Sequence, residues 1–136
     1  MKRLVTVLVF LVATSVTAFA QQSLPVPSAW QNQRTSMMKL YAITPSGAFT
    51  GVYFNNAAGF QCQYGPTNPV PYTVNGHASG NSVIFNVVWS NGIVNCNSRT
   101  VWIGTLQGRT LTTRWTLTGP GIKPIHGTDI FQQWWP

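Results

Sequence analysis

Hydrophobic and polar residues alternate with a period of two along most of the chain, in short runs separated by turn residues. In the segment 82–90, for example, Phe85, Val87 and Trp89 occupy alternate positions. Such runs are rich in Thr, Val, Ile, Tyr and Trp, and nothing after the Pro-containing stretch at 21–28 has the 3.6-residue period of an amphipathic helix. The pattern predicts an all-β protein.

Eight strands are predicted, and most are separated by tight turns rich in Gly, Asn, Pro and Ser. Their ranges are 29–33, 36–44, 48–55, 72–78, 82–90, 98–107, 109–118 and 127–134. Two longer connections are expected at 56–71 and 119–126. Eight sequential strands of this kind favour an antiparallel up-and-down β-barrel, which closes on itself and leaves no exposed edge. A β-sandwich is the alternative architecture.

Basic residues indicate which face of a strand points outward, because an unpaired charged side chain is costly to bury. Arg99, Arg114 and Lys39 mark the outward sets of their strands. The opposite sets, which then face the lumen, are Ser98, Thr100 and Trp102; Thr113, Trp115 and Leu117; and Ser36, Met38 and Leu40. The strand 48–55 has no charge to orient it.

The candidate inward residues combine indoles with polar groups that gather toward one end of the barrel. The indoles are Trp89, Trp102 and Trp115, and the polar residues are Asn32, Ser36, Tyr53, Asn55, Ser98 and Thr100. An eight-stranded barrel is either filled by side chains or holds one small ligand, and tryptophans that merely fill the core are the simpler interpretation. A core that only packs has no need of so many polar groups, so the sequence favours a small-ligand pocket with apolar walls.

The N-terminal residues have the pattern of a secretory signal peptide, with a basic start, MKR, an apolar run and an A-x-A site, AFA, at 18–20. We therefore expect a signal peptide at 1–20, a Pro-containing leader at 21–28 and one domain at 29–136. The protein would be secreted, to the extracellular space or a bacterial periplasm. An uncleaved membrane anchor is the alternative, disfavoured because the apolar core is shorter than a membrane span. No membrane association is expected after cleavage.

Asp129 is the only acidic residue in 136, and the formal net charge of +7 therefore reflects missing acids more than a built cationic surface. The basic residues are scattered, which argues against nucleic-acid binding. One carboxylate is too few for the usual chemistry of glycoside hydrolysis. No nucleophile is placed to form a triad with His126 and Asp129. We expect no enzymatic activity.

The two cysteines, Cys62 and Cys96, are expected to form a disulfide, the default in an exported chain. Both lie in Gly/Asn/Gln-rich stretches that predict loops. Only His77 and His126 accompany them, at no recognisable ligand spacing, so no metal site is predicted.

Five stretches, in order along the chain, can be compared with known families. They are WQNQRTS at 30–36, GAFTGVYFN at 47–55, VVWSNGIVNCNSRTVWIG at 87–104, TRWTL at 113–117 and GTDIF at 127–131. Together they resemble the avidin/streptavidin family of biotin-binding proteins, and the cysteine pair and Asn55 are most similar to its dimeric, rhizavidin-like bacterial branch. The resemblance implies high-affinity, non-covalent biotin binding in the barrel lumen, without a cofactor.

The resemblance also implies a role in binding biotin for the residues of the candidate site. Three donors would converge on the ureido oxygen: Asn32, Ser36 and Tyr53. Two acceptors would receive the ureido N–H groups: Asn55 and Asp129. Four side chains would enclose the bicyclic ring: Trp89, Trp102, Trp115 and Leu117. The hydroxyl of Thr100 would contact the thioether sulfur. Residues at the mouth would meet the valerate carboxylate: Ser98, Ala57 and Ala58.

An ionised Asp129 suits its implied position because a carboxylate accepts hydrogen bonds and has no proton to offer. It would polarise the ureido group toward an oxygen carrying negative charge, which the three donors would stabilise. Without ligand, we expect a donor such as Asn32, or water, to satisfy this carboxylate.

Two features depart from the best-known relatives. Arg34 stands at a turn position where they have an apolar residue, and we expect it to be solvated at the mouth. The segment 118–128 contains no tryptophan, whereas a Trp from that loop covers the neighbouring subunit's ligand in tetrameric relatives. Its absence favours a homodimer over a homotetramer, and a binding site that is left open at its mouth. The outward apolar residues that could form the interface are Ile84, Val88, Val101 and Ile103.

Two alternative functions remain open at this point. A secreted carbohydrate-binding or inhibitory β-module would display aromatic residues on one flat face rather than in a lumen. A barrel of this fold with weakened biotin affinity would be distinguished only by binding data.

Overall fold

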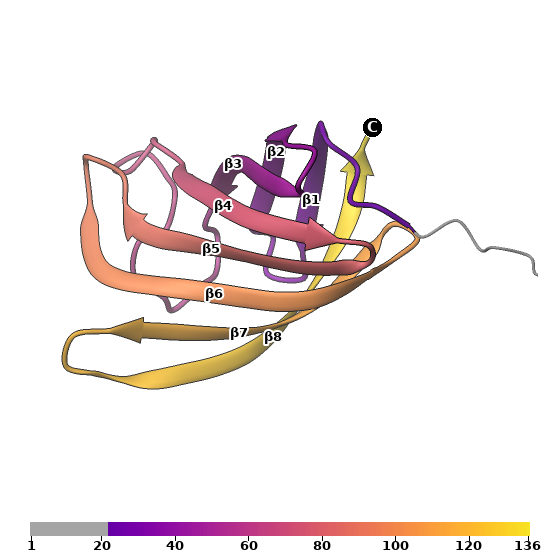
Figure 1. Ribbon diagram of the computed structural model, residues 1–136. Helices are drawn as coiled ribbons and strands as arrows, with labels where there is room; N and C mark the ends of the chain where they lie inside the picture. The colour runs from indigo at the N-terminus through magenta and orange to yellow at the C-terminus, as the bar shows by residue number, and fades with distance from the viewer. Residues whose placement is uncertain (1–21) are drawn as a thin grey trace, which may run out of the picture.

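A computed structural model describes residues 22–136, which form a closed, eight-stranded antiparallel barrel (Figure 1). The strands are β1 (Ser28–Asn32), β2 (Met37–Ile43), β3 (Ala48–Phe54), β4 (Tyr72–Ser79), β5 (Ser82–Ser90), β6 (Asn95–Gln107), β7 (Thr110–Gly119) and β8 (Ile122–Trp135). Each pairs with its neighbours in sequence, and β1 pairs with β8 to close the barrel. The predicted up-and-down barrel is confirmed and the sandwich alternative is wrong.

The predicted signal peptide at 1–20 lies outside the described residues. Over residues 22–136, no helix has the length and apolar character needed to cross a bilayer. Part of the predicted leader packs against the barrel: Leu24 is buried, and the side chain of Gln22 makes two hydrogen bonds with the backbone of Gly108 in the β6–β7 turn.

Two strands begin several residues earlier than the sequence predicts. β6 starts at Asn95, so Cys96 lies in a strand and the prediction of a loop there is wrong, although Cys62 does lie in the β3–β4 connection. β8 starts at Ile122, so the connection predicted at 119–126 is a hairpin in which Gly119 pairs with Ile122. Residues 122–126 are exposed and show no alternation of buried and exposed positions, which is why periodicity does not reveal the strand.

The strand facing inferred from basic residues is confirmed. Arg99 and Arg114 are exposed, whereas Thr100, Trp102 and Trp115 on the opposite faces of β6 and β7 are buried. In β3, which has no charge to orient it, the candidate inward residue Tyr53 is buried together with Phe49 and Gly51 on the same face.

One end of the barrel is filled with packed side chains, and the other is open. Large buried residues that do not line the pocket include Phe85, which stacks on Trp102 with 4.9 Å between ring centroids, and Phe131, which meets Phe85 edge-on. Consecutive connections of an up-and-down barrel alternate between its ends, so the β1–β2, β3–β4, β5–β6 and β7–β8 connections share one end. The last three of these lie toward the left in Figure 1, where the β7–β8 hairpin extends below β6.

Candidate functional site

A cavity of about 340 Å³ opens at the end of the barrel that carries these four connections. Its volume falls in the range of small-ligand sites. The predicted ligand-binding residues that line it are Asn32, Tyr53, Asn55, Ala57, Trp89, Ser98, Thr100, Trp102, Trp115, Leu117 and Asp129. Of the predicted set, Ser36 and Ala58 do not line it. The Ser36 side chain is fully buried, and Ala58 is exposed to solvent.

Three indoles form the apolar walls of this cavity. Trp89, Trp102 and Trp115 are each less than 10% exposed, with relative exposures of 6%, 3% and 7%. Tyr53 packs among them, with its ring centroid 5.3 Å from that of Trp102 and 5.7 Å from that of Trp89. These tryptophans are therefore turned into the lumen and do not form the flat outer face that a carbohydrate-binding module would need.

The indole N–H groups differ in their partners. Trp89 Nε1 donates to Thr100 Oγ1 at 2.8 Å, and Trp102 Nε1 donates to Asp129 Oδ2 at 2.9 Å. These bonds fix two of the walls against polar residues of the pocket. Trp115 Nε1 is buried and has no partner within the described residues.

Asp129 is 3% exposed and accepts hydrogen bonds from three side chains. Besides Trp102, these are Gln33, whose Nε2 lies 3.2 Å from Oδ1, and Arg34, whose Nε lies 3.3 Å from the same oxygen. Asn32 does not reach the carboxylate: its Nδ2 donates to Tyr53 Oη at 3.3 Å. Side-chain donors therefore satisfy the carboxylate, as expected, but Asn32 is not one of them.

The β1–β2 turn explains this arrangement. Thr35 has a positive φ of 63°, and Asn32 Oδ1 accepts from the backbone N–H groups of Arg34 and Ser36, both at 3.0 Å. Gln33 Oε1 also accepts a hydrogen bond from the backbone N–H of Ile130, which anchors the turn on β8. Arg34 is 38% exposed at the mouth, as expected, and this turn also directs its Nε to Asp129.

Tyr53 remains a hydrogen-bond donor in this environment. Burial raises the pKa of its phenol well above the ordinary value, and the negative charge of Asp129 raises it further, against smaller opposing effects of Ser36, Asn32 and Arg34. The hydroxyl therefore keeps its proton at any pH near neutral.

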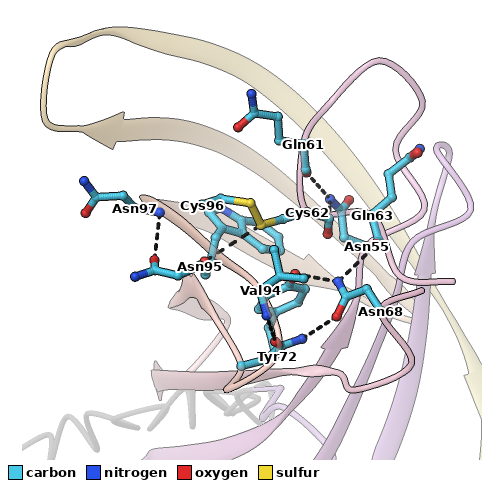
Figure 2. Close-up of a disulfide and its surroundings, with 12 residues drawn as sticks. Asn55, Gln61, Cys62, Gln63, Asn68, Tyr72, Val94, Asn95, Cys96 and Asn97 are labelled. Carbon is cyan, nitrogen blue, oxygen red and sulfur yellow. Dashed lines mark hydrogen bonds between the residues drawn. A yellow bond between two sulfur atoms is a disulfide. The ribbon is translucent and has the colours of Figure 1, made fainter. Parts of the chain in front are cut away.

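The β3–β4 connection is tied to the barrel by the predicted disulfide, which is confirmed between Cys62 and Cys96 (Figure 2). The bond joins residues 34 apart in sequence, and closing a loop of that length stabilises the fold by roughly 4 kcal/mol on the chain-entropy account. Figure 2 also shows Asn55 Nδ2 donating to the carbonyls of Gln61 and Cys62, at 3.3 and 3.2 Å. Asn55 thus organises the loop as well as lining the cavity.

Sequence reasoning missed several residues that line the cavity: Arg34, Gly59, Phe60, Gln61, Cys62, Cys96, Ile122 and Ile125. Most lie in segments predicted to be loops, where alternation carries no information. Phe60 meets Trp115 edge-on, with 6.1 Å between ring centroids. Large apolar residues inside otherwise polar connections were the available signal for Phe60, Ile122 and Ile125. Across residues 22–136, no group of three or more His, Cys, Asp or Glu side chains is close enough to hold a metal ion.

Comparison with known proteins identifies relatives over most of the chain. The model of the Avidin family matches residues 20–132. Afifavidin from Afifella pfennigii is 36% identical over 113 residues, which cover 78% of this chain and 67% of afifavidin. The crystal structure of apo shwanavidin is 37% identical, with a TM-score of 0.73 and coverage of 83% of this chain and 99% of shwanavidin. The structure of a short afifavidin–biotin complex is 36% identical, with a TM-score of 0.68 and coverage of 78% of this chain and 86% of the short afifavidin chain.

The family match extends over the same strands that close the barrel and carry the cavity. The solved relatives share this fold at more than one third identity. On these grounds, the chain belongs to the avidin family.

Proposed function

We propose that the protein binds biotin non-covalently in the cavity at the open end of the barrel. The observation that carries this proposal is the buried carboxylate of Asp129, which shares a cavity of ligand size with Asn32, Tyr53 and three indole walls. The structure of short afifavidin with biotin supports the choice of ligand.

The ureido group is the part of biotin that this polar end fits. Asp129 would accept one ureido N–H, since a carboxylate offers about four acceptor positions and three are engaged in the free protein. Asn32 and Tyr53 would donate to the ureido oxygen.

Ser36 and Asn55 would act together on the same group. In the free protein, the Ser36 hydroxyl donates a hydrogen bond to Asn55 Oδ1 at 3.4 Å and accepts one from the backbone N–H of Asn56. Because a hydroxyl can rotate, Ser36 would turn its proton to the ureido oxygen when biotin enters. Asn55 Oδ1 would then be free to accept the second ureido N–H.

The remaining residues would enclose the ring and the tail. Trp89, Trp102, Trp115 and Leu117 would contact the bicyclic ring, and the Thr100 hydroxyl would face the sulfur. Apolar contact with a ring of this kind gains roughly 25 cal/mol for each Å² removed from water. Ser98, Ala57 and Ala58 would lie at the mouth, near the valerate carboxylate.

We further propose that the protein is a secreted homodimer of the rhizavidin-like type, without enzymatic activity or a cofactor, and with residues 1–20 as its signal peptide. The dimer is supported by an apolar outer face in which Ile84, Val88 and Ile103 are 43%, 54% and 59% exposed. Val101 lies beside them in β6, partly exposed. Secretion is supported by the disulfide.

Titration with biotin tests the ligand assignment. Three tryptophans line the cavity, so we expect biotin to change the intrinsic tryptophan fluorescence to a saturable end point and the protein to be retained on biotin resin. Protein saturated with free biotin beforehand is the control and should not be retained. An unchanged spectrum together with no retention would reject biotin binding and leave the fold intact.

A further inference from the structure

The apolar lining of the cavity continues along the β7–β8 hairpin as far as its turn. Ile125 pairs with Leu117 across this hairpin, Ile122 begins β8 at the turn, and all three side chains belong to residues that line the cavity. Ile122 and Ile125 are nevertheless 40% and 43% exposed. Exposed aliphatic residues that also line a cavity are available for contact with a ligand.

Gly119 shows where Ile122 lies relative to the site. A Cβ added at Gly119 would be 3.0 Å from Ile122 Cδ1 and 3.3 Å from the Cβ of Ser98. Ile122 and Ser98 therefore border the same narrow space between the hairpin and β6. Since Ser98 is the residue proposed near the valerate carboxylate, Ile122 lies where a group attached to that carboxylate would leave the cavity.

The charges of the cavity lining suit an amide at this point better than a free carboxylate. Among the lining residues, within the part of the chain that the structure describes, the one cation is Arg34, and its Nε pairs with Asp129. Ser98 and Gln61 contribute neutral polar groups. A carboxylate loses water at a cost when no cation pairs with it, whereas an amide needs only hydrogen bonds.

We propose that Ile122 and Ile125, together with Phe60 and the Cys62–Cys96 disulfide, form a second, apolar subsite at the mouth, which binds an alkyl group joined to biotin through an amide. This inference rests on the proposed function, because the subsite is defined by where the tail of biotin leaves the cavity. The ligands that it favours are N-alkyl amides of biotin, in which the apolar group directly follows the amide.

The size of the effect follows from the apolar area that the subsite can cover. Burying one methylene completely improves binding by roughly fourfold, so the five extra carbons of a hexyl group would gain roughly a thousandfold over a methyl group. The two isoleucines are themselves exposed to solvent and cover the chain on one side only. A gain of about tenfold is therefore the expected scale.

The experiment compares two neutral ligands, the N-methylamide and the N-hexylamide of biotin. Both have the same head group and the same amide, so the ratio of their dissociation constants isolates the tail, and a uniform change in affinity for the head group cancels. A third amide with a methoxyethoxyethyl tail has a similar length but more polar atoms. Competition calorimetry would measure all three on the wild type and on the variants.

We expect the wild type to bind the hexylamide about tenfold more tightly than the methylamide, and the ether amide no more tightly than the methylamide. Ile122→Ser combined with Ile125→Ser should reduce the hexyl-to-methyl preference below about threefold, whereas Ile122→Val combined with Ile125→Val should keep most of it. Ile93→Ser is the matched control: Ile93 is 54% exposed in the β5–β6 turn at the same end of the barrel and does not line the cavity.

Several results would overturn the inference. Equal affinities of the wild type for the two alkyl amides, with biotin still bound, would show that the mouth has no apolar subsite. An unchanged ratio in the double serine variant, or an equal fall in Ile93→Ser, would place the tail elsewhere. An ether amide as tight as the hexylamide would assign the gain to length. Failure of the wild type to bind biotin or any of its amides would instead reject the proposed function.

Discussion

At the scale of single residues, Asp129 offers the most direct test of the proposed ligand geometry. Asp129→Asn keeps the shape of the side chain, but its amide can present a donor where the ureido N–H needs an acceptor. We expect biotin to bind about tenfold to a hundredfold more weakly, the range for hydrogen bonds to a charged group. Calorimetry on the wild type and the variant would measure the loss.

A neighbouring substitution serves as the control for Asp129→Asn. Thr128→Ser alters the adjacent residue of β8, which is exposed and faces away from the cavity, and should leave the affinity unchanged. Equal affinities of wild type and Asp129→Asn would mean that the carboxylate does not contact the ligand.

Tyr53 gives the fold a dependence on alkaline pH. Because burial raises the pKa of Tyr53, the folded chain keeps the phenolic proton at a pH where the unfolded chain releases it, above about 10. The contribution of Tyr53 to the free energy of unfolding is therefore fully present below that pH. Above it, the free energy of unfolding declines by up to about 1.4 kcal/mol per pH unit because of this group. Tyr53→Phe lacks the group and should lose stability less steeply.

Urea unfolding at several pH values between 8 and 11.5 would measure both slopes. Tyr41→Phe, which changes an exposed tyrosine of β2, is the matched control. Parallel declines of wild type and Tyr53→Phe would show that Tyr53 ionises as easily in the folded chain as in the unfolded one.

At the scale of elements, a few charged residues were enough to orient the barrel from its sequence. One arginine in β6 and one in β7, Arg99 and Arg114, identify the outward faces, and alternation then places Thr100, Trp102 and Trp115 inward. Alternation failed where a strand has no buried face. The start of β8 is exposed throughout and pairs with β7, and no alternation of side chains reveals that pairing.

The pairing of β7 with β8 also explains a glycine in the wall of the pocket. Gly127 lies directly across from Trp115, and a Cβ at this position would overlap the indole at Cζ2 and Cε2. Only a residue without a side chain lets the indole lie flat against β8.

Gly127→Ala should therefore displace the Trp115 wall. We expect a loss of about 1–3 kcal/mol in the free energy of unfolding, the usual cost of overpacking, together with weaker biotin binding. Denaturant unfolding and a biotin titration would measure the two effects. Gly65→Ala, at a position where a Cβ would meet nothing within 4 Å, is the control and should be close to neutral in both. Wild-type affinity in Gly127→Ala would show that the wall adjusts without cost.

At the scale of the whole molecule, the site is assembled from parts that sequence position does not connect. Arg34 and Asp129 are 95 residues apart, and their contact depends on β1 pairing with β8 to close the barrel. The sequence predicted Arg34 at the mouth and Asp129 in the lumen at the ureido group, but not their pairing, because that depends on the conformation of one turn. Closure of the barrel could be predicted from strand number and short connections; the direction of a single long side chain could not.

The outer face of the barrel carries the final prediction, that two copies associate through β5 and β6. Ile84 lies directly across from Ile103 in this sheet, and both are largely exposed in the single chain. A two-fold interface uses the same patch on both copies, so one substitution enters it twice. Ile103→Glu would bring two carboxylates into an apolar contact, where each would lose water without gaining a partner.

We therefore expect the wild type to sediment as a dimer at micromolar concentration and Ile103→Glu to sediment as a monomer. Ile43→Glu is the matched control, because Ile43 is 40% exposed on β2, across the barrel from β6, and should leave the dimer intact. The cavity opens at the end of the barrel rather than on this outer face, so the monomeric variant should still bind biotin. A wild-type monomer, or a dimer that persists in Ile103→Glu, would show that this face is not the interface. Loss of biotin binding together with the dimer would instead mean that the partner subunit completes the pocket.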